Sequence, residues 1–326
     1  MSVFSPWDLP LPYASNHSNL QCFLRCITPV VPTRLLPKKC NEDSNGGNLE
    51  TNEKERDEEG YSLSEVWESY SEWSAYGVDV PIVLNNGDCV VQYYSPSLSA
   101  MQIYTFKPFS SSFRGLGNMV KPENVSCCND DDDDDDDDDD GGGRSEIYNS
   151  SASSNDSCLS SEAAWDEDST QTNTMDQCGC LYYQYNEMAS PYDRVPLQVK
   201  MNELGKHYPG LFDLRSTEIS PYSWMAIAWY PVYQIPMATN VKELSACFLT
   251  YHPLSGSRAG SNKEEISLPP FAVVTYKLFG TLWINPETSD KDTIICQQTA
   301  ACNWLRQLQF QHHDFNFFMS RQSQNP

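Results

Sequence analysis

Few side chains in this 326-residue chain stand in a pattern that could do chemistry. His252 follows a strand-like run, with Cys247 and Ser223 upstream as conceivable nucleophiles. A histidine at a strand end can act as a general base for such a nucleophile. A histidine before a proline, as here, is more often a turn residue. We therefore keep an enzyme of unrecognised type, with a site near His252 and the Tyr230–Tyr233 segment, as an alternative and assign no catalytic residue.

The sequence patterns of familiar enzymes are absent. The run at 256–260 has the wrong spacing for a Gly-x-Ser-x-Gly nucleophile elbow. The glycines at 115–117 lack the third glycine of a dinucleotide-binding turn, and neither a GxxxxGK phosphate loop nor an HExxH motif occurs. None of these enzyme classes is indicated.

Possible metal ligands do not reach a workable spacing. Cys178 and Cys180 form a lone CxC, Cys22 and Cys26 lie one helical turn apart, and the adjacent histidines of the run 312–314 rarely face one ion. We predict no metal site and no cofactor.

The net charge of −24 is concentrated in two segments. Residues 40–60 hold eight acidic and two basic side chains, and residues 121–180 hold nineteen and two, including the run Asp130–Asp140. A calcium loop that starts in this run would need a bidentate Glu where Ile147 stands. The nearly neutral remainder does not favour nucleic acid or an anionic membrane. We expect a protein partner, and the charge favours a basic one; the alternative is that the acidic run is a solvated spacer.

The stretch 223–236, SWMAIAWYPVYQIP, concentrates aromatic residues and prolines. As a strand it is apolar on both faces, which favours a core position, and its two prolines should end the strand or force a bulge or an edge. The tail from Tyr230 is the part expected to be exposed, and aromatic residues beside prolines can bind extended peptides. The candidate ligand- or peptide-binding residues are Trp229, Tyr230, Tyr233, His252 and Arg215.

Two segments lack the apolar residues needed to pack, so residues 38–60 and 110–177 are predicted to be disordered insertions. The remaining ranges, 1–37, 61–109 and 178–320, are then parts of one folded domain. Long loops cost folding little, so one interrupted domain is as plausible as separate ones.

Apolar periodicity predicts the elements of that domain. Helices are expected over 62–77, with Ser62 and Glu65 as a capping box, from Pro196, and over 293–309. A hairpin turns at 85–88, a third strand covers the run SAMQIYTF, and further strands cover 224–230, 246–251 and 271–284. Neither half has enough strands alone, so both should share one largely antiparallel sheet flanked by helices. The fold class is α+β.

The N-terminus has no signal-peptide pattern, and no apolar run is long enough to span a membrane. Twelve scattered cysteines without an export signal favour reduced thiols. We expect a cytoplasmic or nuclear protein that is not secreted.

Several segments resemble a plant protein family of unknown function, catalogued as domain of unknown function 789. They include LSEVWESYSEWSAYGVDVPIVLN, SWMAIAWYPVYQIP, ELSACFLTYH and NWLRQLQFQHHDFNFF. Where such proteins usually carry an arginine, this chain has Gln234. The resemblance implies no activity or site residue. With no catalytic constellation, the preferred function is a non-enzymatic protein-interaction or regulatory module whose oligomeric state the sequence leaves open.

Overall fold

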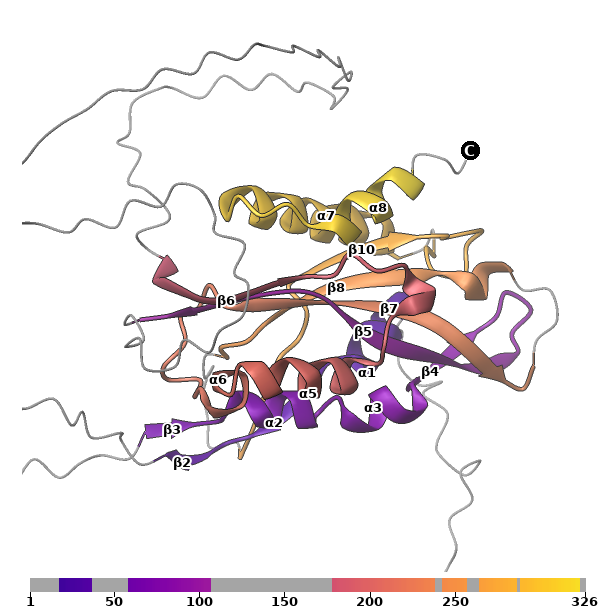
Figure 1. Cartoon of the computed structure of the whole chain (residues 1–326). Coiled ribbons are helices and arrows are strands. Elements are labelled where there is room, and N and C mark those ends of the chain that lie inside the picture. The colour runs from indigo at the N-terminus through magenta and orange to yellow at the C-terminus, as the bar shows by residue number, and fades with distance from the viewer. Residues whose placement is uncertain are drawn as a thin grey trace, which may run out of the picture. The chain divides into compact units, whose positions relative to one another are not determined.

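A six-stranded antiparallel sheet forms the centre of the fold, and both halves of the chain contribute to it (Figure 1). Its strand order is β10-β8-β7-β5-β4, with β6 beside the second half of β5. The strands are β4 (Val78–Val83), β5 (Cys89–Thr105), β6 (Cys180–Asn186), β7 (Trp224–Ile235), β8 (Cys247–Pro253) and β10 (Ala272–Tyr276). The predicted α+β class with a largely antiparallel sheet is confirmed.

The computed structural model describes residues 18–36, 58–106, 178–237, 242–256, 264–285 and 288–322. The chain divides into two units, and every described residue belongs to the unit formed by Met1–Gly115 and Thr172–Pro326. The predicted insertion at 110–177 and the poly-Asp run lie outside the described residues. So does most of the insertion at 38–60, although its last three residues form a short strand.

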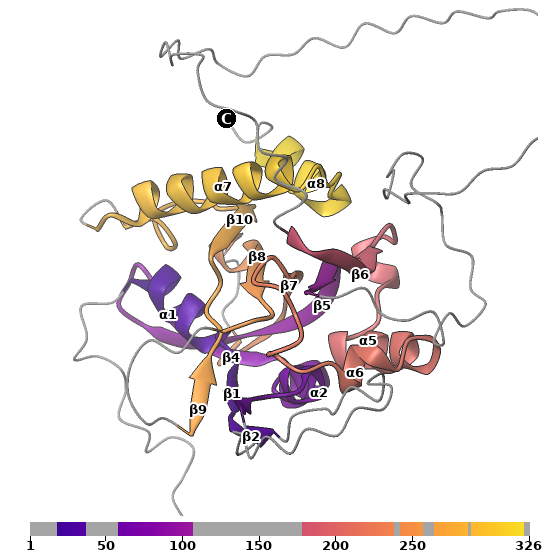
Figure 2. The same cartoon turned by 90° about the vertical axis from the view of Figure 1, so that its left-hand side faces the viewer.

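Helices cover both faces of the sheet (Figures 1 and 2). The helices α7 (Asp290–Gln307) and α8 (His313–Gln322) lie on one face. The other face carries α1 (Asn19–Cys26), α2 (Leu63–Glu68), α3 (Ser71–Tyr76), α5 (Leu197–His207) and α6 (Gly210–Asp213). Each face has its own apolar core, as expected for a sheet whose central strands are apolar on both sides.

Shorter elements surround the sheet. Two small antiparallel pairs join β1 (Val30–Pro32) to β9 (Glu265–Ser267) and β2 (Arg34–Leu36) to β3 (Glu58–Gly60). Two 3₁₀ turns, η2 (Pro191–Asp193) and η3 (Lys242–Ser245), precede α5 and β8 respectively.

The predicted helix over 62–77 forms, but it is divided in two. Its start is as expected, because the Glu65 carboxylate accepts a hydrogen bond from the Ser62 N–H at 2.7 Å. The break falls after α2, where the Ser69 hydroxyl donates to the Val66 carbonyl at 2.6 Å and so competes with the helical ladder. Gly77 ends α3 at φ 81° and ψ 155°, a conformation that is open essentially to glycine alone.

Two strands are longer than the sequence indicates. The predicted second and third strands are one, since β5 runs through Pro96, which lies opposite Trp229. Strand β7 continues past Pro231 to Ile235, and its pairing with β5 shifts register between Tyr93 and Tyr94. The expected disturbance at Pro231 is therefore a bulge and not a strand end.

Other boundaries also differ from prediction. Strand β10 is much shorter than the expected run 271–284, and the last predicted helix is α7, which begins three residues earlier than expected. Helix α8 was not predicted. In the described part of the chain no helix is long and apolar enough to cross a membrane.

Candidate functional site

Two of the five candidate residues lie in the core. Trp229 and His252 are both fully buried. The Trp229 indole donates to the Thr250 hydroxyl at 2.8 Å, and this hydroxyl lies 2.8 Å from His252 Nε2. His252 Nδ1 lies 3.0 Å from the Leu268 carbonyl, which can only accept, so Nδ1 carries the proton and Nε2 accepts from Thr250. Burial lowers the pKa of His252 to about 4, so the ring is neutral at pH 7.

The other three candidates are separate from this pair. Tyr230 is half-buried, and its hydroxyl makes no hydrogen bond within the described residues. Tyr233 is exposed and stacks on Tyr93. Arg215 lies in a turn, where its N–H donates to the Glu218 carboxylate at 2.9 Å, and it forms an isolated bridge with Ser62. The five residues therefore do not form one site.

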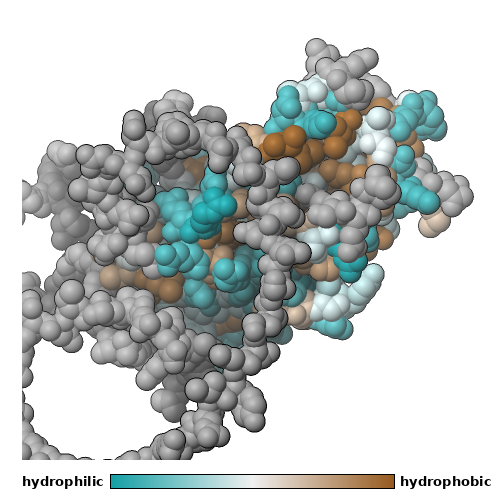
Figure 3. Space-filling model, turned by 90° about the horizontal axis from the view of Figure 1, so that it is seen from above, coloured by the Kyte–Doolittle hydropathy of each residue, from teal (hydrophilic) through white to brown (hydrophobic). Residues whose placement is uncertain are grey.

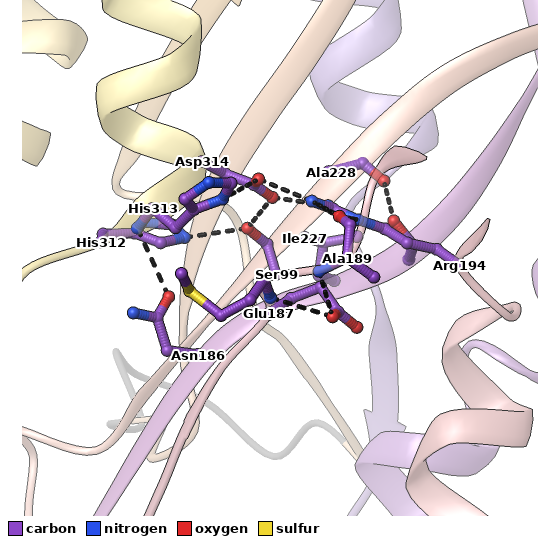
Figure 4. Close-up of polar contacts among 12 residues, drawn as sticks. Ser99, Asn186, Glu187, Ala189, Arg194, Ile227, Ala228, His312, His313 and Asp314 are labelled. Carbon is purple, nitrogen blue, oxygen red and sulfur yellow. Dashed lines mark hydrogen bonds and ion pairs between the residues drawn. The ribbon is translucent and has the colours of Figure 1, made fainter. Parts of the chain in front are cut away.

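A buried polar cluster that the sequence did not predict joins β5 to α8 (Figure 4). Ser99, in the irregular stretch of β5 beside Ala100, donates to Asp314 Oδ2 at 2.5 Å and lies 2.8 Å from His312 Nε2. Arg194 binds the Asp314 carboxylate through both terminal nitrogens, at 2.6 and 2.7 Å. The arginine also donates to the Ala189 carbonyl. The cluster thus ties the segment after β6 to the start of α8.

The direction of these hydrogen bonds does not suit catalysis. The single Ser99 proton goes to Asp314, so His312 Nε2 donates to Ser99, and His312 Nδ1, 2.9 Å from the Tyr251 hydroxyl, accepts from Tyr251. In a nucleophilic triad the serine would donate to the histidine and the acid would contact the histidine. Ser99 is also completely buried. This arrangement holds the fold together and offers a substrate no surface.

The charges of the buried polar cluster neutralise one another. Burial alone would raise the pKa of the Asp314 carboxyl, but the hydrogen bonds and charge of Arg194 lower it below its usual range. Burial lowers the pKa of His312 to about 4, although the Asp314 charge opposes this shift. A neutral histidine beside one matched ion pair is the stable state at pH 7. Among the described residues, no three metal-binding side chains come together.

An exposed apolar surface lies on the sheet itself, at the end formed by β4, β5 and β7. Cross-strand pairing places Val91 beside Ile235 and Tyr93 beside Tyr233 on one face, next to Val83 on β4. We call these five residues the tyrosine face. Val83, Tyr233 and Ile235 are exposed at 42, 43 and 42%. The alternate residues of these strands point into the core.

The described helices leave the tyrosine face uncovered. Helices α7 and α8 lie over the opposite end of the sheet, at β10 and β8, and the β4–β5 hairpin extends beyond them (Figure 1). Strand β7 pairs with β8 only as far as Trp229, so its later residues have a described neighbour on the β5 side alone. Apolar side chains gathered on an uncovered face are typical of a binding surface.

A second exposed apolar surface lies at α7. A shallow hollow of about 250 Å³ is lined by Ile284, Ile294, Ile295, Lys277, Lys291 and four neighbours. Figure 3 shows apolar residues at the surface on the side of the molecule that carries α7 and α8. None of the sequence-predicted site residues lines this hollow.

Comparison with known protein families gives a match over most of the chain. The family described as "Protein of unknown function (DUF789)" matches residues 18–318. The chain belongs to this family. The match covers all of the sheet and the helices on both faces, ending within α8, so the DUF789 domain is the fold described above. No curated protein and no solved structure matches the chain.

Proposed function

We propose that this DUF789 protein is a protein-interaction module that binds a basic, extended segment of a partner on the tyrosine face. The observation that carries the proposal is the exposure of aromatic and aliphatic side chains side by side on an uncovered sheet face. Such a surface buries apolar area on binding, and aromatic residues are enriched in the cores of protein interfaces.

Charge supports a basic partner. Residues 61–105, which include β4 and β5, contain five acidic side chains and no lysine, arginine or histidine. Residues 223–237, which include β7, contain no charged side chain. Within these two stretches no basic side chain offsets the acidic ones, although Glu65 pairs with Arg34 from outside them. The acidic segments at 40–60 and 121–180 add net charge of the same sign. Complementary charge raises the association rate of a basic partner. We place this interaction inside the cell, in the cytoplasm or the nucleus.

The alternative, an enzyme with a site near His252, has less support. His252 is fully buried and uses both ring nitrogens within the core, so a substrate has no path to its base. Tyr233 lies on the exposed surface, whereas Arg215 lies in a separate turn. No observation on the described residues favours this reaction site over the binding surface.

The test is binding of the full-length protein to an array of short randomised peptides. We compare wild type with Ile235→Asp, which places a charge on the tyrosine face, and with Val199→Asp. Val199 is a matched control because it is an exposed aliphatic residue, at 44%, on α5 across the sheet. We expect wild type and Val199→Asp to retain the same peptides, enriched in Lys or Arg between apolar residues, and Ile235→Asp to lose them. Retention of the same peptides by Ile235→Asp would contradict the proposal.

A further inference from the structure

Three side chains form a row across the exposed end of the sheet. Asp79 on β4 lies opposite Tyr93 on β5, and Tyr93 lies opposite Tyr233 on β7. Directly opposed residues point to the same face of a sheet, with Cβ atoms roughly 5 Å apart. A carboxylate therefore stands at one end of a pair of tyrosine rings.

The two rings are held in place before any partner binds. Tyr93 and Tyr233 stack with centroids 4.4 Å apart and ring planes 17° apart. The Tyr233 hydroxyl donates to the Tyr76 carbonyl at 3.2 Å, which fixes the outer ring at its far end. A ligand that binds against these rings would meet a preorganised surface, so little conformational entropy would be lost in ordering the rings.

The carboxylate at the end of the row has no ion-pair partner among the described residues. Asp79 is exposed, and the stretch from Tyr61 to Thr105 contains no basic side chain that could neutralise it. Its charge reaches the rings: burial first, then the Asp79 carboxylate, raises the pKa of Tyr93. A cation beside Tyr93 would find both a negative carboxylate and the negative ring face that Tyr233 leaves free.

Resting on the function proposed above, we propose that the row Asp79–Tyr93–Tyr233 is an arginine-binding site that receives an arginine side chain of the partner. The guanidinium lies flat against the Tyr93 ring, on the face that Tyr233 leaves free, and donates two parallel hydrogen bonds to the Asp79 carboxylate. Arginine suits this row better than lysine because its plane stacks on aromatic rings while its edge pairs with a carboxylate. The neighbouring Val91 and Ile235 contact the apolar residues that flank the arginine.

The experiment uses the full chain and the tightest peptide selected from the randomised array. That peptide is resynthesised with each arginine changed to lysine or to citrulline, a neutral side chain of nearly the same shape. We expect citrulline at one position to weaken binding roughly five- to tenfold, as the sum of one cation–π contact and one exposed ion pair. Asp79→Asn should reduce this preference to about twofold. Glu72→Gln, which removes an exposed carboxylate on neighbouring α3, should leave it unchanged.

Two failures can be told apart. If the selected peptides lack arginine, or if Asp79→Asn keeps the full preference for arginine over citrulline, the arginine site is wrong. The interaction function then still stands, provided that Ile235→Asp abolishes binding. If Ile235→Asp binds the peptides as wild type does, the tyrosine face is not the binding surface and both proposals fall.

Discussion

Loss of one charge from the buried Arg194–Asp314 pair should destabilise the protein more than loss of both charges. Their side chains are 3 and 2% exposed, and two hydrogen bonds of 2.6 and 2.7 Å join them. Arg194→Met removes the positive charge and leaves the Asp314 carboxylate in the interior. Removal of one partner from such a pair costs about 3–5 kcal/mol. That is a large part of the free energy of unfolding of a typical protein, which is about 5–15 kcal/mol.

Removal of both charges tests whether the destabilisation comes from leaving one charge alone in the interior. In Arg194→Met/Asp314→Leu no charge remains in the interior, so most of that penalty disappears. Some loss persists because the Ala189 carbonyl and the Ser99 hydroxyl lose partners, at about 1–3 kcal/mol for each group left unpaired. We expect the double variant to be at least about 1 kcal/mol more stable than Arg194→Met.

The assay is urea-induced unfolding at pH 7, followed by tryptophan fluorescence. Arg34→Met serves as the control, because Arg34 pairs with Glu65 at 2.7 Å but is 62% exposed. This control should lose no more than about 1 kcal/mol. A loss of unfolding free energy in Arg194→Met as small as that in Arg34→Met would contradict this cost of a lone buried charge. So would a double variant that is no more stable than Arg194→Met.

Further predictions concern pH and the backbone. His252 and His312 have folded-state pKa values near 4, against an ordinary value of 6.5, so the unfolded chain takes up these protons first. Their stabilisation is complete above pH 6.5 and falls by about 3 kcal/mol per histidine as pH drops to 4. Unfolding curves at pH 7, 5.5 and 4 test this; equal stability at pH 7 and 4 would contradict it. Gly77→Ala should cost about 1–3 kcal/mol, because a Cβ is strained at φ 81° and would lie 3.2 Å from the Tyr94 carbonyl oxygen. A loss below about 0.5 kcal/mol in the same unfolding assay would show that the backbone can adjust.

The fold was predictable where local signals agree. The capping pair at Ser62 and Glu65, the turn at Gly87 and the alternating apolar residues of β4 each act within a few residues, and the structure follows them. Because neither half of the chain has enough strands for a sheet of its own, the sequence also predicts that both halves share one sheet. The long β5 was missed because Ser95 and Pro96 look like a break, whereas pairing with β7 holds them extended.

The candidate site was less accessible to sequence reasoning. Trp229 and Tyr233 are four residues apart on one strand, yet one is core and the other is exposed. The bulge after Pro231 turns Tyr233 to the face opposite Trp229, and the described helices do not cover that face at this end of the sheet. Such coverage depends on contacts far along the chain. The cluster of Ser99, Arg194 and Asp314 joins residues more than a hundred positions apart. Their only local signal is the polar run 312–314, whose residue types suit metal ligation but whose spacing does not.

Site-specific photo-cross-linking tests the central claim most directly. A photoreactive phenylalanine replaces Ile235 on the tyrosine face, or Tyr192, a tyrosine 96% exposed on η2, in protein expressed in its own cells. We expect an adduct from position 235 to a lysine- or arginine-rich segment of one protein, absent from position 192 and reduced a few-fold with Asp79→Asn. Equal adducts from both positions, or adducts from position 235 only to acidic or uncharged segments, would contradict it.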